Sequence, residues 1–158
     1  MSAKNSEIRV KELMVRNVIT VRATDPLQEA VTLMFENQVS AVPVVDKRRR
    51  CQGILSTTDL VALFLKGPAG QLEPAELDQL AEDLAAASQR DSRLGNRKVS
   101  EVMTASVMTV TLEDTLLTAS REMLRSRVHR LVVVDDQMRV IGILSTMDLL
   151  EAFSAGTE

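Results

Sequence analysis

The stretch Gly-Ile-Leu-Ser-Thr-Thr-Asp-Leu at residues 53–60 recurs as Gly-Ile-Leu-Ser-Thr-Met-Asp-Leu at residues 142–149. The repetition continues outward from these stretches without a gap, so that residues 99–153 repeat residues 10–64. A repeated segment of this length is a supersecondary unit that rarely buries its apolar face alone. The sequence therefore predicts two pseudo-symmetric halves packed on each other, with any site at their seam present in two related copies.

Each copy is predicted to contain a strand, a helix, two strands and a helix, which places the chain in the α/β class. In the first copy, the β-rich run 18–21 precedes a helix with Asp25 as its N-cap and Pro26 at its first position. In the second copy, the strand 107–110 precedes a helix capped by Asp114. Apolar residues at helical spacing form one face of each helix: Leu27, Ala30, Val31, Met34 and Phe35, and Leu116, Ala119, Met123 and Leu124.

A hairpin follows each of these helices. In the first copy the strands 41–45 and 51–55 surround a polar tip. Pro43 donates no backbone hydrogen bond, so its strand must leave that position unpaired or lie at an edge. In the second copy the strands are 131–134 and 140–144.

The last helix of each copy opens with a serine followed three residues later by an aspartate. These pairs are Ser56 with Asp59 and Ser145 with Asp148. Both have the pattern of a capping box, in which each partner's side chain accepts a hydrogen bond from the other partner's backbone.

The two copies are separated by an insert at residues 66–98. Glu73 and Pro74 are predicted to open a helix with an apolar stripe formed by Leu77, Leu80, Ala81, Leu84 and Ala87. This helix either packs on its own domain or serves as a lid or a subunit contact. The expected division is residues 8–65 for repeat 1, 66–98 for the helical insert and 99–154 for repeat 2.

The composition favours binding or regulation over catalysis, so the chain is predicted not to be an enzyme. The chain has one cysteine, Cys51, and one histidine, His129, so a zinc site lacks ligands and a cysteine–histidine pair would need these two to meet. No glycine-rich phosphate loop is present. The net charge of −3, the absence of a membrane-spanning run and the absence of a signal pattern predict a cytoplasmic protein that binds neither nucleic acid nor membrane. The basic cluster 47–50 is either a solvated turn or a nucleic-acid contact.

Two short patterns carry a family resemblance. Each copy has Met-x-x-x-Val-x-Thr-Val near its start and Gly-Ile-Leu-Ser-x-x-Asp-Leu near its end. In this order the patterns resemble the cystathionine-β-synthase (CBS) domain, and two in tandem resemble a Bateman module. Residues 39–46 and 127–135 are also similar to the γ subunit of AMP-activated protein kinase. The resemblance implies that AMP, ADP or ATP binds in clefts between the repeats and regulates an effector protein.

The resemblance also implies roles for individual residues. The aspartates Asp148 and Asp59 are expected to accept hydrogen bonds from ribose hydroxyls, and His129 and Arg130 to contact phosphate. The first cleft is expected to comprise Asn17, Ile19, Val39, Ser40, Ala41, Ser145, Thr146, Asp148, His129 and Arg130. The second cleft is expected to comprise Ser56, Thr57, Asp59, Ser106, Met108 and Val128, close to His129 and Arg130.

Alternatives remain at each step. The Ser–Asp pairs are also explained as helix caps, and His129 as a structural histidine. Ser40 and Ala41 stand where the second copy has His129 and Arg130, so the clefts are expected to be unequal and the Asp148 cleft to be preferred.

Two features of the whole chain also have more than one interpretation. S-adenosylmethionine and NAD are alternative ligands, and an interaction module with empty clefts is the competing function. A homodimer is expected through apolar helix faces that include Leu60, Val61, Phe64, Leu149, Leu150 and Phe153.

Overall fold

The computed structural model describes residues 7–65 and 97–155, so the helix predicted within the insert lies outside the described residues. The chain divides into two compact units. Unit 1 comprises residues 1–18, 47–51 and 106–158, and unit 2 comprises residues 19–46 and 52–105.

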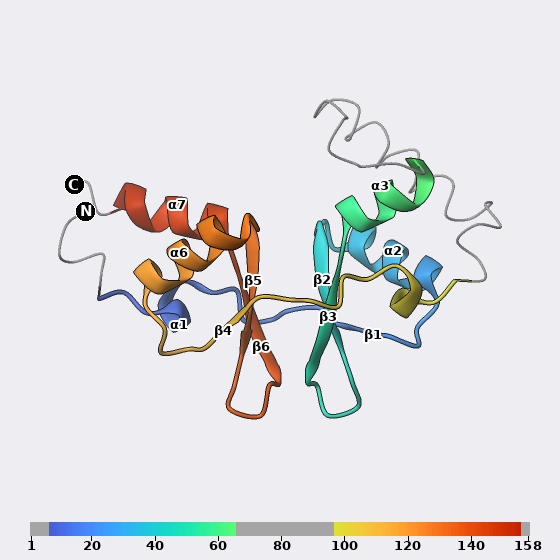
Figure 1. Cartoon of the computed structure of the whole chain (residues 1–158), viewed down its shortest axis with the longest axis horizontal. Helices are drawn as coiled ribbons and strands as arrows, with labels where there is room; N and C mark the ends of the chain where they lie inside the picture. The colour runs from blue at the N-terminus through green and yellow to red at the C-terminus, as the bar shows by residue number, and fades with distance from the viewer. Residues whose placement is uncertain (1–6, 66–96, 156–158) are drawn as a thin grey trace. The chain divides into compact units, whose positions relative to one another are not determined.

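Unit 2 contains a three-stranded sheet in the order β1-β2-β3. Its two helices, α2 and α3, lie on the same face of that sheet (Figure 1). The elements are β1 (Val21–Arg22), α2 (Leu27–Glu36), β2 (Ala41–Val45), β3 (Cys51–Ser56), α3 (Thr57–Leu65) and the 3-10 turn η3 (Val99–Glu101).

Unit 1 repeats this plan with a sheet in the order β4-β5-β6, in which β4 runs parallel to β5 and β6 antiparallel to it. The helices α6 and α7 again share one face of the sheet (Figure 1). The elements are α1 (Val10–Leu13), β4 (Thr109–Val110), α6 (Leu116–Ser126), β5 (Arg130–Val134), β6 (Val140–Ser145) and α7 (Thr146–Ala155). The predicted α/β class and the duplicated order of elements are confirmed.

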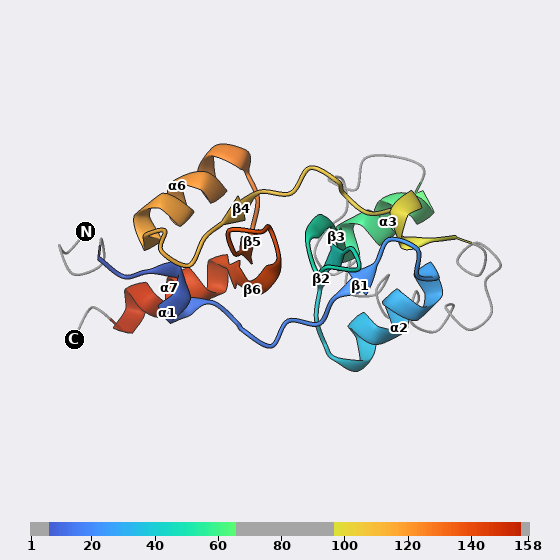
Figure 2. The same cartoon turned by 90° about the horizontal axis from the view of Figure 1, so that it is seen from below.

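The short turn at the start of each sequence repeat packs with the sheet of the other repeat. Val10 is fully buried in the core of unit 1, and Val99 is fully buried in the core of unit 2. Val10 N donates to Asp114 O at 2.9 Å, and Val99 N donates to Asp25 O at 3.0 Å. Figure 2 shows α1 beside α7. The compact units therefore differ from the sequence repeats by an exchange of these turns, and residues 47–51 of the first repeat also belong to unit 1.

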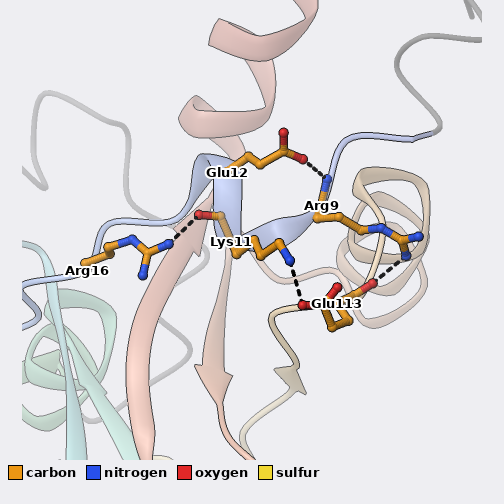
Figure 3. Close-up of polar contacts among 5 residues, drawn as sticks. All are labelled: Arg9, Lys11, Glu12, Arg16 and Glu113. Carbon is orange, nitrogen blue, oxygen red and sulfur yellow. Dashed lines mark hydrogen bonds and ion pairs between the residues drawn. The ribbon is translucent and has the colours of Figure 1, made fainter.

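Polar contacts also tie the first described residues to the loop before α6 (Figure 3). Lys11 Nζ forms an ion pair with Glu113 Oε1 at 2.7 Å, and Arg9 Nη1 donates to Glu113 O at 2.7 Å. The Lys11 hydrogen bond and charge lower the pKa of the Glu113 carboxyl below its usual range. Around the turn, Arg9 N donates to Glu12 Oε2 and Arg16 Nη2 donates to Lys11 O.

Pro43 lies in β2, the middle strand, so of the two predicted alternatives the structure has the unpaired position and not the edge strand. In unit 1, the equivalent Val132 donates its N–H to Met108 O at 3.2 Å. Proline has no N–H to make that bond. The parallel ladder in unit 2 accordingly pairs β1 only with Val44 and Val45.

The N-caps predicted at Asp25 and Asp114 are wrong by one residue. Pro26 is the N-cap of α2, and Thr115 is the N-cap of α6, where its side chain accepts from Thr118 N. The two aspartates instead close the preceding turns. Asp25 Oδ2 accepts from Arg22 N, and Asp114 Oδ2 accepts from Thr111 N, each at 2.8 Å. A nearby turn amide outside the helix competes for the side chain of an aspartate.

The predicted apolar helix faces are buried with two exceptions. Phe35 and Leu124 occupy equivalent positions on α2 and α6 and remain 64% and 79% exposed. They lie at the edge of the apolar stripe, where the helix surface turns toward solvent.

The apolar face proposed for dimer contacts is also smaller than the sequence suggested. Leu60, Val61 and Leu149 are buried within their own units, so these three side chains are not available for a dimer contact, whereas Leu150 of the same set is exposed. Met147 and Leu150, three residues apart on α7, are 61% and 58% exposed. Among the residues that the structure describes, no helix is long and apolar enough to cross a membrane.

Candidate functional site

The two Ser–Asp pairs form capping boxes with nearly the same geometry. Asp148 Oδ2 accepts from Ser145 N at 2.7 Å and from Ser145 Oγ at 3.0 Å, while Asp148 N donates to Ser145 Oγ at 3.3 Å. For Asp59 and Ser56 the corresponding distances are 2.8, 2.9 and 3.2 Å. The predicted capping role is confirmed, and in both units it fixes the carboxylate through Oδ2 and leaves Oδ1 for other donors.

The sheet of unit 1 places the predicted phosphate residues next to the Ser145–Asp148 pair. Arg130, the first residue of β5, is registered opposite Ser145, the last residue of β6. Thr146 N donates to His129 O at 3.0 Å. Five of the predicted site residues are therefore gathered at the edge where β6 passes into α7.

Unit 2 gathers the equivalent set, in which Asp59 is kept and the histidine and arginine are absent. Thr57 N donates to Ser40 O at 2.9 Å, which brings Ser40 next to Ser56 and Asp59. Ala41 follows as the first residue of β2 and is buried. The same backbone arrangement thus carries a histidine and an arginine in one unit and a serine and an alanine in the other.

The positive charge in unit 1 is partly desolvated. Burial lowers the pKa of the Arg130 guanidinium from its usual value. The group stays protonated at physiological pH, because arginine ionises far above that range. His129 is exposed. The Coulomb attraction between a half-buried guanidinium and an anion is stronger than for a fully solvated one, because less water screens the two charges.

Sequence reasoning missed Thr104, which contacts Asp59, and its counterpart in the other repeat, Val15. Each lies in a short antiparallel bridge: Val15 with Ile143 in unit 1, and Thr104 with Ile54 in unit 2. The Thr104 hydroxyl donates to Asp59 Oδ1 at 2.8 Å. Alignment of the two repeats could have identified this difference, because residue 15 is the counterpart of residue 104. Threonine has a hydroxyl where valine has a methyl group.

Both bridges require a glycine in the facing strand. A Cβ at Gly53 would lie 2.7 Å from Thr104 O, and a Cβ at Gly142 would lie 2.9 Å from Val15 O. These distances are shorter than real Cβ contacts. The repeated glycine at the start of the Gly-Ile-Leu-Ser pattern therefore lets the segment that carries Val15 or Thr104 approach the site.

The remaining predicted residues divide between the units. Ile19 and Val39 are partly buried against the core of unit 2, and Met108 and Val128 against the core of unit 1. Asn17 and Ser106 are exposed residues of unit 1. Each predicted cleft thus draws residues from both units, and its assembly stays a prediction.

Other candidate sites are weaker. Within residues 7–65 and 97–155, no group of three or more histidine, cysteine, aspartate or glutamate residues is placed to hold a metal ion. The basic cluster includes Arg48, Arg49 and Arg50, which are exposed at the turn between β2 and β3. The backbone of this turn pairs with the other hairpin turn, where Val140 N donates to Arg49 O at 2.8 Å.

Comparison with known proteins identifies relatives over nearly the whole chain. A protein of Methanocaldococcus jannaschii of uncharacterized function is 29% identical, over 94% of this chain and 93% of its own length. The γ subunit of 5'-AMP-activated protein kinase from Dictyostelium discoideum is 30% identical over 84% of this chain, which spans only 21% of that protein.

Two solved structures show the same fold. A crystal structure of CBSX2 in complex with AMP has a TM-score of 0.71 at 24% identity, with 96% of this chain and 99% of that chain covered. The CBS domain pair of protein MJ0100, in complex with 5'-methylthioadenosine and S-adenosyl-L-methionine, has a TM-score of 0.68 at 19% identity, with 94% and 98% covered. The CBS domain family itself matches residues 10–66 and 99–155. The chain therefore belongs to the CBS domain family, as a tandem pair of these domains.

Proposed function

We propose that this chain is a regulatory module that binds an adenosine nucleotide and passes its bound state to an effector protein. The observation that supports the proposal is the register of Arg130 opposite Ser145, which brings the residue that carries a guanidinium to the strand end where Ser145 fixes the Asp148 carboxylate. A nucleotide has the complementary groups, an anionic phosphate and a ribose diol that donates hydrogen bonds.

The carboxylate of Asp148 suits the ribose. Its Oδ2 is held by two donors from Ser145, so the group is oriented before a ligand arrives. Hydrogen bonds to a charged acceptor contribute about 1.5–3 kcal/mol each, more than those between neutral groups. Because this acceptor is oriented in advance, binding does not include the entropic cost of ordering the Asp148 side chain.

The phosphate would lie against Arg130, with His129 beside it. Arginine offers two parallel donors to phosphate oxygens. The adenine base would be held by the apolar residues Ile19 and Val39, because the aromatic content of 2% makes stacking a minor mode. The relatives support this ligand class, since one solved pair contains AMP and another contains two adenosine derivatives.

Calorimetric titration with AMP tests the proposal. Asp148→Ala is expected to weaken AMP binding by at least about 1.5–3 kcal/mol, which is the scale of one hydrogen bond to a charged group. Asp59→Ala is the matched control and is expected to cost less. Equal losses in the two variants would contradict the preference for Asp148, and the absence of AMP binding by the parent protein would contradict the nucleotide role. The same titration with ADP, ATP, S-adenosylmethionine and NAD compares the affinities of the candidate ligands.

A homodimer is the second part of the proposal. Met147 and Leu150 share one exposed face of α7, and exposed apolar side chains at helical spacing favour contact with a second apolar face. Light scattering is expected to show a dimer that Leu150→Glu converts to a monomer. Leu124→Glu, at an exposed leucine of α6, is expected to leave the dimer intact. A parent protein that is monomeric at micromolar concentration would overturn this part.

A further inference from the structure

One hydroxyl distinguishes the two Ser–Asp pairs. Thr104 Oγ1 donates to Asp59 Oδ1 at 2.8 Å. Asp148 has Val15 at the equivalent position, and valine has the shape of threonine without the donor. The backbones agree closely: Thr104 N donates to Ile54 O at 2.9 Å, and Val15 N donates to Ile143 O at 2.9 Å. The difference between the two pairs therefore lies in this side chain rather than in the path of the chain.

The number of acceptor positions left for a ligand follows from these contacts. A carboxylate oxygen has two lone pairs. In both units, Oδ2 already accepts from a serine amide and a serine hydroxyl, so it is full. Asp148 Oδ1 accepts no hydrogen bond from the part of the chain that the structure describes, whereas Asp59 Oδ1 accepts one. Two acceptor positions remain on Asp148 and one on Asp59.

We propose that Thr104 is a specificity-determining residue. Its hydroxyl takes one of the two acceptor positions of Asp59 Oδ1, so Asp148 is the preferred acceptor for the cis-diol of a ligand. The inference rests on the proposed function and adds the Thr104 hydroxyl to the absent histidine and arginine as a cause of the inequality of the two sites. A ribose brings two O–H donors, and Asp148 Oδ1 can accept both. Asp59 Oδ1 can accept only one, unless the Thr104 hydroxyl turns away and loses its own hydrogen bond. The chain then binds one nucleotide strongly rather than two equally.

The test exchanges the two side chains and measures AMP binding by calorimetry. In the Asp148→Ala background, which leaves only the Asp59 site, adding Thr104→Val is expected to tighten AMP binding about tenfold, because one hydrogen bond to a charged group is regained. In the parent background, Val15→Thr is expected to weaken AMP binding about tenfold. Both positions are exposed, so the exchange leaves the two cores intact.

Matched controls separate the hydroxyl from other effects of substitution. Thr104→Ser keeps a donor and is expected to bind AMP as its background does, and Val15→Ala adds no donor and is expected to bind as the parent does. If the parent binds AMP and the exchange variants match their backgrounds, the inference fails and the proposed function stands. Two equal sites in the parent would also overturn the inference. If no protein of the set binds AMP, the proposed function fails and the inference with it.

Discussion

Val10 and Val99 occupy equivalent positions in the repeat, and each is fully buried in the unit that holds the sheet of the other repeat. Val10 packs in one core with Leu116, and Val99 packs in the other with Leu27. Each turn supplies a side chain that the core of its unit would otherwise lack. In the folded chain, the two repeats thus exchange the equivalent turns that carry Val10 and Val99.

Truncation of either valine is expected to destabilise the unit that receives it. Val10→Ala and Val99→Ala each remove two buried methyl groups and leave a cavity, which costs about 1.5–3 kcal/mol. Urea unfolding measures the loss in the free energy of unfolding. Val15→Ala is the control, because Val15 is 50% exposed and its truncation is expected to cost little. Equal losses at residues 10 and 15 would show that α1 does not pack as described.

A methyl group at Gly142 is expected to disturb the approach of the segment that carries Val15. The new Cβ would lie 2.9 Å from Val15 O, which is backbone and cannot rotate away. Overpacking of this kind typically costs about 1–3 kcal/mol. Gly142→Ala is therefore expected to lower the midpoint of urea unfolding. An unchanged midpoint would mean that the Met14–Val15 segment moves without cost.

The ion pair between Lys11 and Glu113 gives a prediction for pH dependence. Because the folded-state pKa of Glu113 is lowered, chiefly by the hydrogen bond from Lys11, its contribution to stability is complete above the unfolded-state pKa. That contribution is lost as the pH falls through the folded-state pKa. Lys11→Gln is expected to raise the pKa of Glu113, as followed by NMR titration of its side-chain carboxyl carbon. An unshifted titration would contradict the contact. The effect on unfolding is expected to be small, because both side chains are exposed.

Removal of the Arg130 guanidinium is expected to weaken AMP binding by about 10–100-fold, which corresponds to about 1.4–2.8 kcal/mol. Adenosine has no phosphate, so its affinity for the parent and for Arg130→Ala is expected to be equal. Paired titrations of nucleotide and nucleoside make the comparison. If adenosine loses as much affinity as AMP, Arg130 shapes the fold or the pocket and does not bind phosphate.

The repeat in the sequence was sufficient to predict the class, the order of elements and both capping boxes. Local patterns determine these features, since Ser145 and Asp148 are three residues apart and their hydrogen bonds depend only on that spacing. The exchange of Val10 and Val99 was not predictable in the same way. The sequence of so short a turn indicates that its valine is buried. It does not indicate whether that valine packs in the core of unit 1 or in the similar core of unit 2.

In the candidate site, the sequence pattern identified the two aspartates but not the contact that makes them differ, because that contact joins residues far apart in the sequence. The family pattern marks Asp59 and Asp148 alike, and only the structure shows that Asp59 also accepts from Thr104, which is 45 residues away in sequence. Asp25 and Asp114 show the opposite error. Their position before a helix predicts a cap, but a turn amide three residues earlier takes the carboxylate in each case.

The division of the chain into units also sets the order in which a nascent protein can fold. Unit 2 ends at residue 105, whereas unit 1 needs both the first residues and those after 105. Domains generally fold as units while the ribosome is still adding residues. Arg9 leaves the ribosome 104 residues ahead of its partner Glu113. On a growing chain, unit 2 is therefore expected to fold first. The segment with Val10 is expected to stay exposed to solvent until the residues that form the core of unit 1 have been translated.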